Sequence, residues 1–271
     1  MIDDPRGYSE IPEADTRIEE YWRSMLLGTH KAFRQGRNFF RHLPHSPRCK
    51  FCAAPFAGPA APFMRMIDKG PWPQNPKYCG GCFKQLTKHG GGAEVPCSLL
   101  FADIRGSTAM AETMSPTRFK TLLDRFYHVA ADVLVDHDAI VDKFVGDEVV
   151  ALFIPALAGA DHAGRAVGAA RSLLKALGYG DGRPWVEAGA GVHSGQAYVG
   201  GVGVNEKYEF TALGDAVNVA ARLAAAAGPG EVIVSDAAAA AAGIPTAGLE
   251  HRRLELKGKS EPTPVVVLRA G

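Results

Sequence analysis

Two aspartates stand where short apolar runs of the sequence end. Asp103 closes the run CSLLFADI and is followed by Arg-Gly-Ser-Thr, and Asp147 follows Gly146 in VDKFVGDEVV. The glycine permits a tight turn that leaves the Asp147 carboxylate pointing outward. Taken singly, each aspartate is most simply explained as a helix cap or a turn former. Together, at the ends of neighbouring strands, they could share one or two hard divalent cations, as in sites that bind Mg²⁺ with a phosphate substrate.

Further polar residues near the C-terminus have types that suit a phosphorylated ligand. Asn218 and Arg222, in GDAVNVAAR, are four residues apart and therefore share one face of a helix. An amide and a guanidinium on one face could hold a ribose and a phosphate. Lys257, in LELKGKS, adds a cation at the end of a strand. The GKS at 258–260 is not a phosphate loop of the NTPase kind, because Arg253 stands where that motif needs its first glycine.

Four cysteines precede this part of the chain as two pairs, Cys49-x2-Cys52 and Cys79-x2-Cys82, with 26 residues between the pairs. Two such pairs supply the four thiolates of a tetrahedral structural zinc site. A redox-active pair of dithiols and an iron–sulfur centre are the alternatives, and two disulfides are disfavoured in a reducing cytoplasm. We expect the zinc to stabilise a small module. The fifth cysteine, Cys97, is expected to be a buried structural residue.

Five segments occur in order over about residues 97–270: LFADIRGST, VDKFVGDEVVALF, AGVHSGQAYVGGVG, YEFTALGDAVNVAARL and LELKGKSEP. In this order and spacing the chain resembles the class III nucleotidyl cyclases, the adenylate/guanylate cyclase catalytic domain. The resemblance implies an α/β fold, namely an α+β sandwich with a ferredoxin-like core and a mainly antiparallel sheet. It also implies two Mg²⁺ or Mn²⁺ ions for each active site.

The resemblance implies a role for the residues that could do chemistry. Asp103 and Asp147 correspond to the two metal-binding aspartates, with the backbone carbonyl of Ile104 as a further ligand. Asn218 and Arg222 correspond to the pair that orients the ribose and stabilises the pentavalent α-phosphate. The family acts as a head-to-tail dimer, so we expect a homodimer in which each site takes its aspartates from one protomer and its nucleotide contacts from the other.

Four other residues correspond to substrate contacts of the family. Lys257 and Lys207 would contact the triphosphate, and Lys143 and Thr211 occupy the base-recognition positions. This lysine–threonine pair departs from the lysine–aspartate pair typical of adenylate cyclases and from the glutamate of guanylate cyclases. A lysine can donate to adenine N1 and a threonine oxygen can accept from the 6-amino group, which favours ATP. Pyrimidine triphosphates and GTP remain as alternative substrates.

The expected reaction is the conversion of ATP to 3′,5′-cyclic AMP and pyrophosphate. A catalytically inactive cyclase-like sensor or scaffold is the alternative from another class, and the presence of all these polar residues argues against it. The GDE at 146–148 suggests a diguanylate cyclase as a further alternative. Val145 argues against it, because it stands where that family needs a further glycine.

Composition divides the chain into three parts. We expect an N-terminal helical segment over 1–45, a four-cysteine zinc-binding module and linker over 46–95, and the catalytic domain over 96–271. The linker is predicted at KHGGGAEVP (88–96), because three successive glycines are costly to hold in a helix or strand. The input to the N-terminal module and its regulatory partner are left open by the sequence.

Hydrophobic spacing predicts the main elements. Residues 15–41 have helical periodicity with a break near Gly28 or Gly36, and residues 139–154 form a hairpin. WVEAGAGVHSG and QAYVGGVG are expected to be two strands. The alternation of strands and helices is typical of a layered α/β protein.

Charge and hydropathy exclude several classes of partner. Residues 1–96 carry 14 Lys and Arg against 9 Asp and Glu, whereas the remaining residues carry 16 against 20. This modest asymmetry, without a strong basic stripe, argues against nucleic acid as the main partner. No apolar run of about 18 residues occurs, so no membrane partner is expected. The polar, acidic N-terminal sequence is not a secretory signal, and we expect a cytoplasmic protein.

Overall fold

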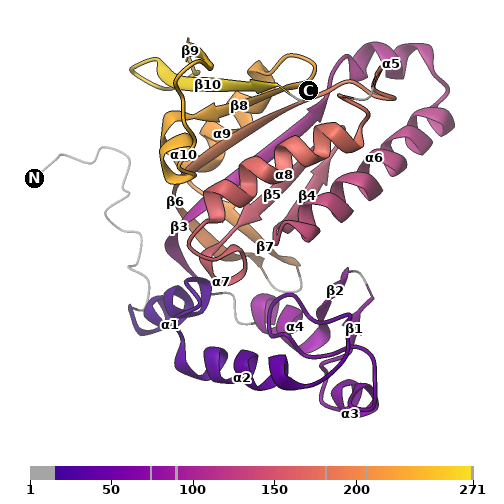
Figure 1. Cartoon of the computed structure of the whole chain (residues 1–271), viewed down its shortest axis with the longest axis vertical. Coiled ribbons are helices and arrows are strands. Elements are labelled where there is room, and N and C mark those ends of the chain that lie inside the picture. The colour runs from indigo at the N-terminus through magenta and orange to yellow at the C-terminus, as the bar shows by residue number, and fades with distance from the viewer. Residues whose placement is uncertain (1–15, 74, 89–90, 181, 205–206, 270–271) are drawn as a thin grey trace, which may run out of the picture.

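The computed structural model describes residues 16–73, 75–88, 91–180, 182–204 and 207–269, and Figure 1 shows its layers. Its helices are α1 (Thr16–Leu26), α2 (Lys31–His42), α3 (Ala61–Met66), α4 (Gly80–Lys88), α5 (Ser107–Thr113), α6 (Pro116–Asp136), α7 (Pro155–Ala158), α8 (His162–Ala176), α9 (Asp215–Ala226) and α10 (Asp236–Ala241). Its strands are β1 (Pro71–Trp72), β2 (Asn75–Cys79), β3 (Gly92–Ile104), β4 (Ile140–Val145), β5 (Glu148–Phe153), β6 (Ala188–Val204), β7 (Lys207–Leu213), β8 (Glu231–Ser235), β9 (Glu250–Leu254) and β10 (Thr263–Arg269). Among these residues no helix is both long and apolar enough to cross a membrane.

The periodic segment near the N-terminus forms two helices, α1 and α2. The break lies at Gly28, whose φ of +71° belongs to the left-handed region that glycine adopts at little cost. Gly36 continues α2, so the expected break is confirmed at the first glycine only. Trp22, Met25 and Leu26 of α1 are buried, so this helix contributes its apolar face to the core.

An eight-stranded sheet organises the rest of the chain, with the order β4-β5-β3-β6-β8-β10-β9 and with β7 paired to β6. Every pair is antiparallel except β6 with β8, which confirms the predicted mainly antiparallel α+β fold. The two strands predicted around residue 195 are one continuous strand, the 17-residue β6. The reason is its partner, because β3 pairs with β6 without interruption from Gly92 opposite Gly200 to Ile104 opposite Ala188.

Alternate residues of β3 enter two different hydrophobic clusters, as the two-residue period of a strand requires. One cluster contains Leu99 and Phe101 with α1, the cysteine segments and α9. The other contains Leu100 and Ala102 with α6 and α8, which cover the opposite face of the sheet in Figure 1. The N-terminal module and the sheet therefore share one core.

The start of β3 differs from the predicted linker. Residues 92–96 are strand residues paired with β6, so the linker prediction is wrong for them. Glycine is required here for packing, because a Cβ on Gly200 would lie 2.4 Å from the Cα of Gly92. The glycines allow two backbones to approach closely, and they do not form a hinge. The division of the chain into three domains at residues 45 and 95 stays a prediction.

Candidate functional site

The two aspartates singled out from the sequence lie next to each other. Asp103 is the penultimate residue of β3, and Asp147 lies in the β4–β5 turn, where Gly146 has a φ of +62°. The backbone N–H of Ile104 donates to the carbonyl oxygen of Asp147 at 3.3 Å, which fixes the turn against the end of β3. The two carboxyl groups are close enough that each shifts the pKa of the other. The sheet thus brings together two acidic groups that are 44 positions apart in the sequence.

The charge state of this pair is strongly perturbed. Burial and the neighbouring Asp147 carboxyl raise the pKa of Asp103 to about 7, against the opposing effect of Arg105. Burial alone would raise the pKa of Asp147, but its interactions with Asp103 and Ser107 lower it below its usual value. One proton shared between two adjacent carboxyl groups explains the opposite directions.

One oxygen of Asp103 is buried without a protein partner. Arg105 Nη2 lies 3.1 Å from Asp103 Oδ2, but within the described chain Oδ1 has no hydrogen-bond partner. A buried, unpartnered carboxylate oxygen beside a second carboxylate is a donor set that suits a hard divalent cation. The residues present therefore fit the metal pair that the sequence predicted.

Arg105 is a residue of this site that the sequence analysis did not single out. Its guanidinium also donates to the carbonyl oxygen of Ala224 at 3.0 Å, close to the C-terminal end of α9. Arg105 therefore connects the aspartate pair to the helix that carries Asn218 and Arg222. The sequence shows that Arg105 follows Asp103 by two residues, but it does not show that the Arg105 side chain points toward Asp103 and α9.

The two predicted base-recognition residues, Lys143 on β4 and Thr211 on β7, are connected through Asp142. The Thr211 hydroxyl donates to Asp142 Oδ2 at 2.7 Å, and Lys143 Nζ lies 3.8 Å from the same oxygen. Lys143 Nζ also lies 3.7 Å from Glu209 Oε2. Sequence reasoning missed both acidic residues, although Asp142 directly precedes Lys143 and Glu209 shares a strand face with Thr211.

Asn218 and Arg222 lie one turn apart on α9, as their spacing predicted. Asn218 is exposed and Arg222 is half-buried. A Cβ placed on Gly258 would lie 3.7 Å from Arg222 Nη2, so the loop between β9 and β10 passes beside the guanidinium. The neighbouring Lys257 is exposed on that loop. Lys207 is the first residue of β7, and its side chain lies outside the described part of the structure.

The predicted metal ligands and the predicted nucleotide contacts form separate groups in a single chain. In the described part, no hydrogen bond or ion pair joins Asp103 or Asp147 directly to any of the predicted nucleotide contacts, which are Lys143, Thr211, Asn218, Arg222 and Lys257. Asn218, Arg222 and Lys257 also have no such partner among the described residues. The side chains of Asn218, Arg222 and Lys257 therefore remain available to bind a ligand.

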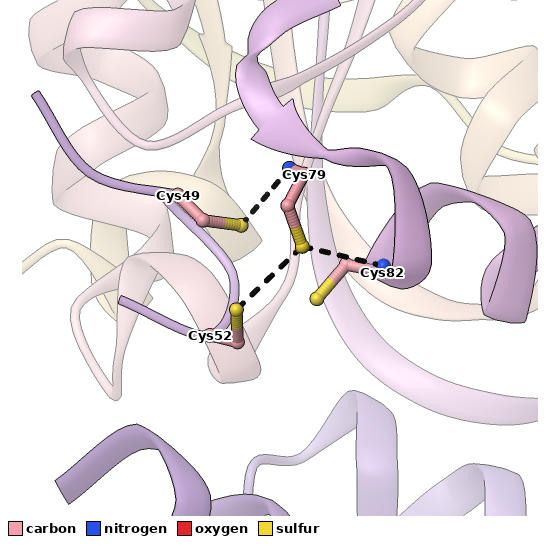
Figure 2. Close-up of side chains that lie close together, drawn as sticks. All are labelled: Cys49, Cys52, Cys79 and Cys82. Carbon is pink, nitrogen blue, oxygen red and sulfur yellow. Dashed lines mark hydrogen bonds between the residues drawn. The ribbon is translucent and has the colours of Figure 1, made fainter. Parts of the chain in front are cut away.

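The four predicted zinc ligands form a second cluster, drawn in Figure 2. All four thiols are buried and free, and their sulfur atoms lie within 4.8 Å of one another. Cys52 Sγ and Cys79 Sγ are 3.7 Å apart, and the Cys79 N–H donates to Cys49 Sγ at 3.2 Å. Zn–S bonds of about 2.3 Å in a tetrahedron place sulfur atoms about 3.8 Å apart. The geometry therefore suits a tetrahedral thiolate site.

The cysteine cluster is attached to the strand that carries Lys143. The Tyr78 hydroxyl donates to the carbonyl oxygen of Ala139 at 2.9 Å, and Lys50 Nζ lies 3.0 Å from Asp138 Oδ1. Ala139 directly precedes β4. The module that holds the cysteines therefore contacts the catalytic part of the chain at the start of β4.

Cys97 is separate from the other four cysteines. It is fully buried in β3, and burial raises the pKa of its thiol to about 12. A thiol that stays protonated and inaccessible is chemically inert, which agrees with the structural role expected from the sequence.

The sequence is similar to proteins of the cyclase family. The profile of the adenylate and guanylate cyclase catalytic domain matches residues 93–268. An uncharacterised protein of Mycobacterium tuberculosis is 33% identical over 181 residues, which cover 64% of this chain and 32% of that protein. Adenylate cyclase 1 of Rhizobium meliloti is 35% identical over 130 residues, or 46% of this chain and 20% of that protein. The chain thus spans a third or less of the length of these curated relatives.

Solved structures of two cyclases resemble the fold. The guanylyl cyclase Cya2 matches with a TM-score of 0.60 and 26% identity, over 65% of this chain and 93% of that chain. The adenylyl cyclase CyaB from P. aeruginosa matches with a TM-score of 0.57 and 25% identity, over 66% of this chain and 97% of that chain. Since one makes a guanine product by name and the other an adenine product, the likeness does not decide the base.

Proposed function

Since the chain belongs to the family of adenylate and guanylate cyclase catalytic domains, we propose that it converts ATP to 3′,5′-cyclic AMP and pyrophosphate. The observation that carries the proposal is the adjacent pair Asp103 and Asp147, held together through the Ile104 backbone, with the buried Oδ1 of Asp103 left without a protein partner. In this reaction the ribose 3′-oxygen forms a bond to the α-phosphorus, the bond to pyrophosphate breaks, and the hydroxyl proton is released.

Asp103, Asp147 and the backbone carbonyl of Ile104 would hold two Mg²⁺ or Mn²⁺ ions. When bound, such cations lower the pKa of the ribose hydroxyl and neutralise the polyphosphate. The unpartnered oxygen supports this assignment, because a carboxylate oxygen is seldom buried without a donor unless a cation is its partner. Arg105 balances the charge of the aspartate pair in the metal-free chain.

The remaining residues would bind and orient the nucleotide. Arg222 stabilises the negative charge that grows on the α-phosphate, and Asn218 holds the ribose so that its 3′-hydroxyl faces the phosphorus. Lys257 and Lys207 contact the triphosphate. The roles of Asn218, Arg222 and Lys257 are supported by the fact that no other described residue forms a hydrogen bond or ion pair with them.

We place each active site between two copies of the chain. Asp103 and Asp147 of one protomer face Lys143, Thr211, Asn218, Arg222 and Lys257 of the other. The lack of a direct contact between these two groups in the described part of one chain supports a shared site. A homodimer would contain two complete sites, and a monomer would be inactive.

The base is assigned from Lys143 and Thr211. Lys143 donates to adenine N1, and the Thr211 oxygen accepts from the 6-amino group. GTP and the pyrimidine triphosphates are the alternative substrates, and an inactive nucleotide sensor is the alternative function. A full set of polar residues at the predicted positions favours the enzyme over the sensor.

We also assign a structural Zn²⁺ to Cys49, Cys52, Cys79 and Cys82. The support is a buried set of four free thiols with tetrahedral spacing. A reducing cytoplasm is the compartment that fits five free cysteines. The segments 1–45 and 46–95 would then stabilise or regulate the catalytic domain at 96–271.

A nucleotide panel with the purified full chain tests the proposal. ATP, GTP, CTP and UTP are supplied separately with Mg²⁺ or Mn²⁺, and cyclic nucleotide and pyrophosphate are both quantified. The expected result is equal amounts of cyclic AMP and pyrophosphate, with ATP the best substrate by kcat/KM. Nucleotide binding without any cyclic product would favour the sensor. A better kcat/KM with GTP or a pyrimidine triphosphate would reassign the substrate.

A further inference from the structure

A β-bulge in β4 lies at Asp142. In the pairing of β4 with β5, Val141 is opposite Ala151 and Lys143 is opposite Val150, so two steps along β4 match one step along β5. Asp142 is the extra residue. Neighbouring residues of a regular strand point to opposite faces, whereas a bulge redirects a side chain, and bulges are frequent beside active sites. The bulge allows Asp142 and Lys143 to approach the same part of β7.

At this position Asp142 contacts Thr211. Its side chain is only 4% exposed, and its Oδ2 accepts the Thr211 hydroxyl proton at 2.7 Å. Lys143 Nζ lies 3.8 Å from the same oxygen. Burial raises the pKa of Asp142 above its usual value, and the Thr211 hydrogen bond and the Lys143 charge offset part of this rise. An ionised carboxylate accepts hydrogen bonds and cannot donate one.

We propose that Asp142 determines the base preference of the site, because its carboxylate holds the Thr211 hydroxyl proton and leaves the Thr211 oxygen only as an acceptor toward the base. This inference rests on the proposed function, in which Lys143 and Thr211 contact the base. A hydroxyl has one proton and two lone pairs. With the proton directed to Asp142, Thr211 can accept from an amino group and cannot donate to a carbonyl oxygen.

An acceptor at Thr211 and a donor at Lys143 match the hydrogen-bonding groups of adenine. Position 6 of adenine carries an amino donor for Thr211, and its N1 is an acceptor for the Lys143 ammonium. Hypoxanthine and guanine reverse both groups, with a carbonyl oxygen at position 6 and an N–H at position 1. They would place acceptor against acceptor at Thr211 and donor against donor at Lys143. Leaving a buried polar group unpaired is what makes such discrimination strong.

Asp142 is therefore a positioning residue that acts through Thr211. A purely structural role would require only some hydrogen-bond partner for Thr211. A carboxylate is a costly choice for that purpose, because burying a charge carries a desolvation penalty. Glu209 is the useful contrast: its carboxylate is 3.7 Å from Lys143 Nζ, but its side chain is 75% exposed and Thr211 donates to Asp142 instead.

The test compares ATP with inosine triphosphate, which has an oxygen in place of the 6-amino group and a proton on N1. The quantity measured is the ratio of kcat/KM for ATP to that for inosine triphosphate. We expect Asp142→Asn and Asp142→Ala each to lower this ratio about tenfold, the value of one mismatched hydrogen bond. Thr211→Val should lower it by a similar factor. Adding Asp142→Asn to Thr211→Val should lower it no further.

Glu209→Gln is the matched control, since it removes the other carboxylate near Lys143 and should leave the ratio unchanged. Thermal unfolding of every variant shows which ones fold. An unchanged ratio in Asp142→Asn would overturn the proposal, as would a further fall when Asp142→Asn is added to Thr211→Val. A wild-type chain without preference between the two nucleotides would overturn it too.

Affinities for both nucleotides, measured by calorimetry with Mn²⁺, separate this proposal from the proposed function. Binding with the expected ratio but without cyclisation would contradict the enzyme and support the role of Asp142. Cyclisation with a ratio that does not respond to Asp142 would support the enzyme and contradict that role.

Discussion

Asp103 and Asp147 lie next to each other, at the end of β3 and in the β4–β5 turn, because the Ile104 N–H donates to the Asp147 carbonyl oxygen at 3.3 Å. Both carboxyl groups would be negatively charged in water. Two carboxyl groups held this close repel each other unless a proton or a cation lies between them. Burial and the Asp147 carboxyl raise the pKa of Asp103 to about 7 in the metal-free chain, so a proton is held there. A divalent cation would replace this proton, so the pair should be needed for catalysis and dispensable for folding.

Replacing Asp103 by asparagine should abolish catalysis without unfolding the chain. The substitution keeps the shape of the side chain but removes the charge that a divalent cation needs. We expect kcat to fall by at least about 100-fold, with an unchanged or higher thermal midpoint. Cyclic AMP production and thermal unfolding are measured together. Asp124→Asn, on α6 with a side chain 43% exposed, is the control that should retain activity; a fully active Asp103→Asn would rule out the metal pair.

Mixing two inactive variants should restore activity. Asp103→Ala lacks a metal ligand and Arg222→Ala lacks the phosphate contact, so a mixed dimer has one intact site. Partial recovery of cyclic AMP production is expected on mixing: about a quarter of the wild-type value for equal amounts with full random subunit exchange, because half of the dimers are mixed and each has one of its two sites intact. If the mixture stays inactive while a subunit-exchange assay shows mixed dimers, the shared site is excluded.

Arg222→Ala by itself should lower kcat far more than it raises KM. The guanidinium is assigned to charge that develops only in the transition state, so its loss costs about 3–4 kcal/mol of activation free energy. Steady-state kinetics with ATP gives both parameters. Asn218→Ala, assigned to ribose orientation, should also lower kcat. An Arg222→Ala effect confined to KM would reassign this arginine to ground-state binding.

Removal of the Zn²⁺ that we propose at the four clustered cysteines should destabilise the whole chain. The cysteines lie in the same hydrophobic cluster as Leu99 and Phe101 of β3. We expect Cys49→Ser to lose the zinc and to lower the thermal midpoint by at least about 5 °C. Metal content is measured by atomic emission and stability by calorimetry. Cys97→Ala is the control, since it should keep one zinc per chain.

The stability of the chain should depend on pH through Glu231. Its carboxylate binds the Arg252 guanidinium through two hydrogen bonds of 2.7 and 2.8 Å, which lower its pKa to about 2. Because folding lowers this pKa, the stabilisation is fully present above about pH 4.5 and is lost as the pH falls toward 2.

Glu231→Gln should therefore lower the free energy of unfolding by about 2 kcal/mol at pH 7. The difference from wild type should shrink at pH 3 in urea titrations. Glu250 binds the same arginine but is exposed, so Glu250→Gln should have a smaller effect at pH 7. Equal differences at both pH values would show that the Glu231 charge contributes nothing.

Much of the fold follows from local patterns in the sequence. Short continuous apolar runs predict β3 and β5, and Gly146 marks the turn that presents Asp147. The helical spacing of Asn218 and Arg222 places both on one face of α9. These features depend on residues close in sequence, and the structure has them where they were expected.

Features that depend on distant residues were not predictable from the sequence. The continuity of β6 depends on its long partner β3, and the early start of β3 depends on the close packing of Gly92 and Gly200. Asp142 contacts Thr211 at a bulge of β4. In a regular strand the neighbouring side chains of Asp142 and Lys143 would face opposite sides of the sheet, and the bulge lets both reach β7. One-residue register effects of this kind arise from strand pairing, which local periodicity does not encode.

Gly92, Gly200 and Thr211 lie abreast across three adjacent strands, since Gly92 is opposite Gly200 in one ladder and Gly200 is opposite Thr211 in the next. Gly92, the first residue of the eight-stranded sheet, follows the helix α4 that carries Cys82, and only the strand β6 lies between it and the threonine assigned to the base. A displacement of the backbone at Gly92 would therefore have to cross a single strand to reach Thr211.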